Sequence, residues 1–212
     1  DSGRLSLRGV DVTDWAPWQR ARGRMGRSFQ EARLFPSLTV AETVAVAFER
    51  NVASRSMVAD VLHQPASFEA ELATAGRVDE ILNLLGLDEH RRKLTAELST
   101  GMRRIVELAC LLAADPVVLL LDEPSAGVAQ RDAEALAPLL LRIRDTTGAA
   151  LLVIEHDLAL LRSMCDEMVA LELGAVIARG TPEEVLANER VISGYLGTDS
   201  TAIERSDSAV PV

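Results

Sequence analysis

The stretch 117–132, with the sequence VVLLLDEPSAGVAQRD, constrains the fold of this chain more than any other. It begins with five apolar residues that do not alternate with polar ones, and Asp122 and Glu123 follow directly. An unbroken short apolar run is typical of a strand buried on both faces, as in a parallel sheet flanked by helices. Carboxylates at its carboxyl end lie where open α/β sheets bind ligands. The same run also fits a core strand that ends in a polar turn without a function.

Two further segments indicate strands of the same kind. Residues 149–154 form a second unbroken apolar run, which predicts a second buried strand, and Glu155 and His156 follow it. Residues 24–29 are few enough for a strand, and Gln30 comes next. The chain therefore predicts an α/β fold with a mostly parallel sheet flanked by helices.

Capping residues and apolar periodicity predict the helices. Thr39 and Glu42 form a capping-box pair before a helix that extends to about Phe48. Ser99 occupies an N-cap position before a long helix. Further elements are expected as follows: an edge strand at 4–10, a helix at 67–87, a short charged helix at 88–93, an amphipathic helix at 132–147 that Pro138 could kink, and a hairpin within 168–178.

Composition narrows the classes of function. The net charge of −10 argues against a general nucleic-acid binder, because phosphate neutralisation needs surplus Lys and Arg. The arginines in the first thirty residues are most simply a solvated basic face. No apolar run approaches the ~18–20 residues that span a bilayer. Cys110 and Cys165 show no metal-type spacing, so buried free thiols in a reducing compartment are expected.

Each polar residue at a predicted strand or helix end has an ordinary explanation when taken alone. Gln30 is then a loop glutamine, Ser99 a helix cap, and His156 a hydrogen-bonded loop histidine. Their joint order argues against coincidence: a glutamine after one strand, Ser-x-Gly at the start of a helix, Asp-Glu after the next strand, and a histidine after the third.

In this order of motifs, residues 1–197 resemble the ATP-binding-cassette (ABC) ATPases. Gln30 is similar to the Q-loop glutamine, LSTGM at 98–102 to the signature motif, and 117–122 to the Walker B strand. Glu123 is similar to the catalytic glutamate, 125–132 to the D-loop, and His156 to the switch histidine. The segments GRSFQEARLFPSLTVAET and EEVLANERVISGYLG are most similar to the cassettes of branched-chain amino acid importers.

The resemblance implies ATP and Mg²⁺ as cofactors and a role for each matched residue. Asp122 and Gln30 are expected to hold Mg²⁺, since a hard cation prefers oxygen ligands. Glu123 is expected to polarise the attacking water, and His156 to contact the γ-phosphate. The flexible loop of Gln30 is expected to report the nucleotide state to a partner.

The signature helix is expected to bind nucleotide in a second subunit, as part of an ATP-sandwiched dimer. Ser99, Thr100 and Gly101 lie at a helix amino terminus, where free N–H groups favour an anion. Asp132 of the D-loop is assigned to the same nucleotide-binding set. The motif reads LSTGM where the family usually has LSGGQ, so Thr100 adds bulk and Met102 removes a polar amide. We expect both differences to be tolerated.

The sequence contains no G-x-x-x-x-G-K-[ST] motif. Because residues 1–14 resemble the segment after the P-loop helix, we expect a chain truncated after the Walker A motif, with the P-loop strand and helix missing, and inactive alone. The loss of that strand is expected to expose apolar flanks of its neighbours. The predicted organisation has four parts. Residues 1–38 are a partial amino-terminal part of the ATPase core with the Q-loop, and 39–98 are a helical subdomain. Residues 99–197 are the core with signature helix, Walker B, D-loop and switch histidine, and 198–212 are a disordered tail.

The resemblance implies the ATP-hydrolysing subunit or domain of an ABC importer, for branched-chain amino acids or related solutes. Membrane permease subunits, a second ATPase subunit and, indirectly, a solute-binding protein are the expected partners, at the cytoplasmic face of the bacterial cell membrane. One alternative is a soluble ABC ATPase that acts on nucleic acid or ribosomes, which the acidic charge disfavours. A degenerate cassette that only binds a partner is another, and the intact motif residues argue against it.

Overall fold

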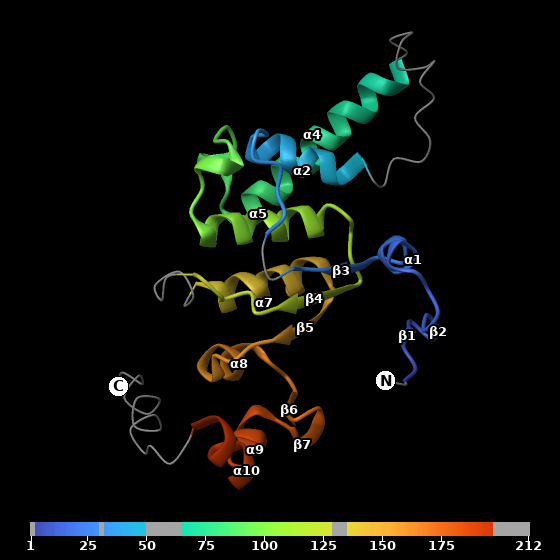
Figure 1. Cartoon of the computed structure of the whole chain (residues 1–212). Helices are drawn as coiled ribbons and strands as arrows, with labels where there is room; N and C mark the ends of the chain where they lie inside the picture. Colours follow the sequence, from blue (N-terminus) through green and yellow to red (C-terminus); the bar gives the residue numbers. More distant parts are fainter. Residues whose placement is uncertain (1–2, 30–31, 50–64, 129–134, 197–212) are drawn as a thin grey trace.

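The computed structural model describes residues 3–29, 32–49, 65–128 and 135–196. These residues form an elongated molecule with a helical lobe at one end, a parallel sheet in the middle, and a hairpin with short helices at the other end (Figure 1). The predicted α/β class, with a parallel sheet flanked by helices, is confirmed. The tail predicted at 198–212 lies outside the described residues.

The parallel sheet consists of β3 (Met25–Arg27), β4 (Val118–Asp122) and β5 (Ala150–Ile154), in that order. β4 is the central strand, as the apolar run predicts. Leu119 and Leu121 on this strand are almost completely buried. They belong to a core that also includes side chains of α5 (Thr100–Leu112) and α7 (Leu136–Thr147).

The prediction that the second apolar run is buried on both faces is wrong for the described part of the chain. Leu152 and Ile154 are each 60% exposed, whereas Leu151 and Val153 pack against the core. Side chains of a strand alternate between its two faces. The core therefore covers one face of β5, and no described element covers the other.

The helical lobe is built from α2 (Val40–Glu49), α4 (Pro65–Leu85) and α5. The predicted capping box of α2 is present: Thr39 N donates to Glu42 Oε2 at 2.8 Å, and Glu42 N donates to Thr39 Oγ1 at 3.2 Å. These hydrogen bonds from the Thr39 backbone and hydroxyl lower the pKa of Glu42. Ser99 caps α5, as predicted, and accepts a hydrogen bond from Met102 N.

The main hydrophobic core joins the lobe to the sheet. It contains buried residues of α2, α4, α5, β4 and α7, so no solvent layer separates the lobe from the sheet. Cys110 of α5 lies in this region, and burial, with a smaller effect of Glu107, raises the pKa of its thiol to about 12. Both cysteines are free and partly buried, in agreement with the predicted buried thiols.

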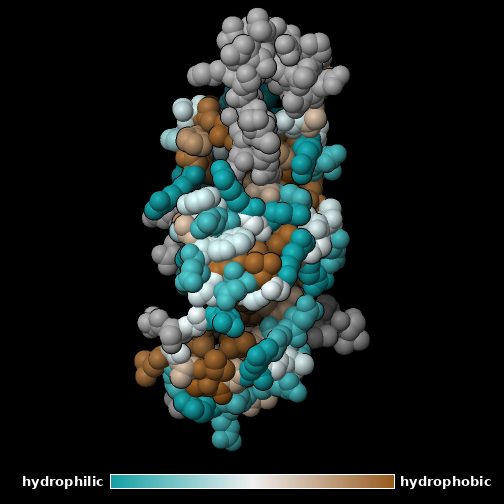
Figure 2. Space-filling model, turned by 90° about the vertical axis from the view of Figure 1, so that its right-hand side faces the viewer, coloured by the Kyte–Doolittle hydropathy of each residue, from teal (hydrophilic) through white to brown (hydrophobic). Residues whose placement is uncertain are grey.

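Two tight hairpins flank the sheet. β1 (Ser6–Leu7) and β2 (Val10–Asp11) replace the single strand predicted at 4–10, because Arg8 and Gly9 both adopt positive φ and reverse the chain. The second hairpin, formed by β6 (Met168–Glu172) and β7 (Ala175–Gly180), is the one predicted within 168–178. Hydrophobic side chains gather at the height of this hairpin in Figure 2, and Val169, Leu171 and Val176 are at least half exposed.

Two expectations for helices need correction. The charged helix at 88–93 is only a 3-10 turn, Asp88–His90. Pro138 lies in the first turn of α7, where proline is tolerated, and not within a longer helix. The remaining elements are α1 (Pro17–Arg22), a 3-10 turn (Thr95–Glu97), α8 (Leu158–Met164), α9 (Pro182–Leu186), α10 (Glu189–Val191) and a π-helical turn (Ile192–Leu196). Within the described ranges, none of these helices combines the length and apolarity of a membrane span.

Replacing Leu119 by alanine is expected to lower the free energy of unfolding by about 3 kcal/mol, because it removes a fully buried side chain and leaves a cavity. Leu152→Ala on the adjacent strand is the matched control and should change this free energy by less than about 1 kcal/mol, since most of the side chain is exposed. Urea unfolding followed by circular dichroism measures both. If both variants lost the same free energy of unfolding, the conclusion that one face of β5 is exposed would be wrong.

Candidate functional site

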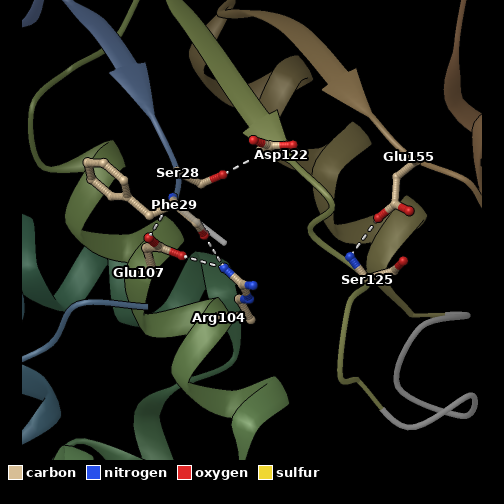
Figure 3. Close-up of polar contacts among 7 residues, drawn as sticks. All are labelled: Ser28, Phe29, Arg104, Glu107, Asp122, Ser125 and Glu155. Atoms are coloured by element: carbon tan, nitrogen blue, oxygen red, sulfur yellow. Dashed lines mark hydrogen bonds and ion pairs between the residues drawn. The ribbon is translucent and has the colours of Figure 1, made fainter. Parts of the chain in front are cut away.

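The carboxyl ends of the three parallel strands meet at one edge of the sheet. β3 leads into Ser28, β4 ends at Asp122, and β5 leads into Glu155. Two hydrogen bonds join these ends: Asp122 N donates to Ser28 Oγ at 3.0 Å, and Glu123 N donates to Ile154 O at 2.8 Å. Figure 3 shows Ser28, Asp122 and Glu155 around this edge, each from a different strand end. The sequence-predicted carboxylates therefore lie beside the end of β5.

Asp122 and Glu123 are both partly buried at the end of the central strand. The Asp122 carboxylate accepts no hydrogen bond from any described residue, so it is available to bind a cation or ligand. Glu123 has φ +46°, a left-handed conformation that costs a non-glycine residue about 1–2 kcal/mol. Strain of this kind is concentrated at functional sites, where the surrounding structure holds it in place.

Glu155 has a fully buried side chain that ties the loop after β4 to the end of β5. Its Oε1 accepts a hydrogen bond of 2.7 Å from Ser125 N (Figure 3). Its Oε2 accepts one of 3.2 Å from His156 N. Sequence reasoning placed Glu155 at a strand end but gave it no role. The contact with Ser125 spans 30 residues, and no local sequence pattern signals it.

His156 follows Glu155 and extends into solvent. Its side chain is 70% exposed, and its Nδ1 lies 3.9 Å from Glu155 Oε2. Asp157 caps α8 by accepting a hydrogen bond from Leu160 N. The backbone of His156 is thus fixed on both sides, while its imidazole remains accessible to a ligand.

The amino end of α5 lies near the loop that follows β4. A Cβ atom placed on Gly127 would be 3.4 Å from Thr100 Cγ2, so the two segments almost touch. Ser99 and Thr100 are exposed, and Gly101 is partly buried. α5 therefore presents an accessible amino terminus, with N–H groups that can bind an anion.

Two of the predicted site residues, Gln30 and Asp132, lie outside the described residues. Phe29, which directly precedes Gln30, is described: its ring is half exposed, and its N–H donates to Glu107 Oε1 at 3.2 Å. Sequence reasoning did not assign a role to Glu107 or to its neighbour Arg104. Their positions on α5 carry no signal of the contact.

The described residues contain no group of three or more His, Cys, Asp and Glu side chains that could hold a metal ion. A site for Mg²⁺ usually needs only one or two protein carboxylates, together with substrate phosphates and water. Asp122 is the described residue that could supply such a carboxylate.

Lys93 is the only lysine in the sequence, and it lies in the helical lobe, where its carbonyl oxygen accepts a hydrogen bond from Val40 N.

Two family models match the sequence. The one described as "ABC transporter" covers residues 1–126, which is more than half of the chain. The one described as "Branched-chain amino acid ATP-binding cassette transporter" covers residues 175–201. Together they include both the segment with the strand-end carboxylates and the last described elements.

Individual proteins match over most of the chain. The high-affinity branched-chain amino acid transport ATP-binding protein LivG of Salmonella typhimurium is 32% identical over 195 residues, which cover 92% of this chain and 76% of LivG. BraF of Pseudomonas aeruginosa, described in the same words, is 31% identical with the same coverage. Among solved structures, cbiO1 of Clostridium perfringens, part of the ABC transporter complex cbiONQ, has a TM-score of 0.73 and 26% identity, over 98% of this chain and 76% of cbiO1.

Replacing Glu155 by alanine is expected to lower the free energy of unfolding by about 2–4 kcal/mol, because the N–H groups of Ser125 and His156 lose their acceptor. Glu183→Ala on α9 is the matched control, since this carboxylate is exposed and its loss should change stability by no more than about 0.5 kcal/mol. Denaturant unfolding of the two variants gives the comparison. A loss for Glu155→Ala no larger than that of the control would show that this carboxylate does not hold the strand ends together.

Proposed function

This chain belongs to the ABC transporter family, and we propose that it is the ATP-binding subunit or domain of an importer for branched-chain amino acids or related solutes. ATP binding and hydrolysis are the activity of this family's nucleotide-binding chains. The solute class is supported by two findings: the names of the relatives LivG and BraF, and the match of residues 175–201 to the branched-chain transporter model.

The observation that carries the catalytic part of the proposal is the meeting of strand ends at one edge of the sheet. In this proposal Asp122 binds Mg²⁺, Glu123 polarises the attacking water, and His156 contacts the γ-phosphate. The Asp122 carboxylate, which accepts no hydrogen bond from any residue that the structure describes, and the exposed His156 imidazole support these roles. The hydrogen bond from Glu123 N to Ile154 O supports them too, because it holds the two strand ends at a fixed separation. Bound Mg²⁺ would neutralise phosphate charge during hydrolysis.

The remaining motif residues are proposed to act with a second subunit and with the nucleotide. Ser99, Thr100 and Gly101 bind the nucleotide held by the other ATPase subunit, through the amino terminus of α5. Their accessibility supports this role. Gln30 completes the Mg²⁺ and water shell, and Asp132 belongs to the nucleotide-binding set.

ATP-binding subunits of ABC importers work with membrane permease components and dimerise. For this chain we propose that the helical lobe contacts the permease, and that the protein is peripheral at the cytoplasmic face of the bacterial membrane. A solute-binding protein would be an indirect partner. The position of the lobe at one end of the molecule supports this, because its outer surface is separate from the strand-end site (Figure 1).

The catalytic assignment is tested by Glu123→Gln. The test uses a chain extended at its amino end with the P-loop strand, loop and helix of another ABC ATPase, since residues 1–212 contain no P-loop motif. Loss of the base is expected to lower ATP turnover by at least about a hundredfold while ATP remains bound. Phosphate release measures turnover, and size-exclusion chromatography with Mg-ATP should show accumulated dimers.

Glu183→Gln in the same extended chain is the control, because Glu183 is an exposed carboxylate on α9, outside the strand-end site. It should leave turnover unchanged. If the Glu123→Gln variant retained normal turnover, Glu123 would not be the catalytic carboxylate, and the role of Asp122 beside it would need to be reconsidered.

A further inference from the structure

Glu155 is a buried carboxylate that contacts two different parts of the strand-end site. Its side chain is 0% exposed. Oε1 accepts a hydrogen bond of 2.7 Å from Ser125 N, in the loop that follows Glu123 (Figure 3). Oε2 accepts one of 3.2 Å from His156 N and lies 3.9 Å from His156 Nδ1. One carboxylate therefore contacts both the loop after β4 and the histidine after β5.

Capping these two backbone N–H groups does not require a charge. Removing a carboxylate from water costs much more than removing a neutral amide, unless the charge is paired or fully hydrogen-bonded. An amide oxygen has two lone pairs and can accept from N–H groups without that cost. Among the residues that the structure describes, His156 is the one whose basic nitrogen lies within ion-pair distance of Glu155. The negative charge therefore has the imidazole as its described partner.

The imidazole of His156 presents one nitrogen to Glu155 and leaves the other for a ligand. Nδ1 is the nitrogen beside Oε2, and the side chain is 70% exposed, so the ring has room to turn. A carboxylate oxygen can accept a second hydrogen bond, and a separation of about 2.9 Å would make one. Hydrogen bonds of this kind are often long before a ligand binds and shorten when it does. A bond from Nδ1–H would fix the ring and direct Nε2 away from the carboxylate.

We propose that Glu155 is a positioning residue for His156: its carboxylate accepts a hydrogen bond from Nδ1–H, so that Nε2 is the nitrogen that meets the γ-phosphate. The proposal rests on the role given to His156 under the proposed function. A proton taken up from solvent at Nε2 gives an imidazolium whose Nε2–H donates to a phosphate oxygen, and Glu155 balances the positive charge. The bond to Ser125 N links this arrangement to the loop after Glu123.

The first test determines which nitrogen of His156 carries the proton in the 212-residue chain. Two-bond 1H–15N NMR spectra distinguish the Nδ1–H tautomer from the Nε2–H tautomer. The sequence has only three histidines, so the spectrum of His156→Gln identifies the signals of His156. At about pH 9, where histidine side chains are neutral, we expect the Nδ1–H tautomer to predominate. A predominant Nε2–H tautomer would overturn the proposal without any variant of Glu155.

Glu155→Gln separates positioning from backbone capping. Its amide oxygen can still accept from backbone N–H groups, but the charge is lost, so Tm should fall by no more than about 5 °C. The tautomer ratio of His156 should shift toward Nε2–H by at least about threefold, because the acceptor for Nδ1–H is weakened. Glu183→Gln is the control, since this carboxylate is exposed on α9, and it should leave the ratio unchanged. An unchanged ratio in Glu155→Gln would show that the carboxylate does not orient the ring.

Turnover in the chain extended with a P-loop segment gives an independent test. Glu155→Gln should lower kcat for ATP by at least about tenfold while KM changes less than about threefold, because a misplaced imidazole affects the reacting geometry more than ground-state binding. In a chain that already carries His156→Gln, the same substitution should lower kcat by less than about twofold more, since no imidazole is left to position. If the two effects multiplied instead, Glu155 would act independently of His156, and the positioning role would be wrong.

The two proposals can fail separately. If the unsubstituted extended chain hydrolyses no ATP, the proposed function fails, and the tautomer of His156 in the 212-residue chain still decides whether Glu155 orients the ring. If that extended chain hydrolyses ATP normally and Glu155→Gln changes neither the tautomer ratio nor kcat, only the positioning role fails.

Discussion

The pairing of β4 between β3 and β5 is the constraint on which the rest of the structure depends. All three strands run in the same direction, so their carboxyl ends must meet at one edge. Burial of Leu119 and Leu121 holds the central strand against α5 and α7, and any shift of register would move these side chains out of the core. Asp122 and Glu123 are therefore placed by the core behind them together with their backbone hydrogen bonds to Ser28 and Ile154.

Buried charged side chains determine how the loops leave that edge. Glu155 holds the backbone of Ser125, and the Arg104–Glu107 pair holds that of Phe29. Both arrangements use charge-assisted hydrogen bonds to backbone groups, which are stronger than neutral ones. They differ in origin: Glu155 directly follows β5, whereas the pair belongs to α5. The end of β5 thus holds Ser125 after β4, and α5 holds Phe29 after β3.

The strand-end site and the exposed apolar surface lie on neighbouring parts of the same sheet. β5 contributes to the site through Glu155 and His156, and on one face it exposes Leu152 and Ile154. Further exposed apolar side chains occur on the β6–β7 hairpin. These exposed apolar side chains of β5 lie directly beside residues that are proposed to bind nucleotide. Covering this surface would bring new groups close to the site, since the same strand serves both.

The sequence by itself determined the features that depend on local pattern. The unbroken apolar run placed β4, the Thr39–Glu42 pair placed the start of α2, and Ser99 placed the start of α5, because strand burial and helix capping involve residues within a few positions of one another. The order of motifs was sufficient for the family resemblance. The hairpin at Arg8 was not predicted, since positive φ at a non-glycine residue leaves little trace in the sequence.

Only the tertiary structure decided the contacts between distant positions. Glu155 meets Ser125 across 30 residues, and Arg104 and Glu107 meet Phe29 across 75 and 78 residues. No local propensity distinguishes these three residues from ordinary surface charges. The exposure of Leu152 was likewise decided by the fold, because an apolar run predicts a strand but not which of its faces another element covers. Local pattern determines which element forms, and the packing of elements determines what each side chain touches.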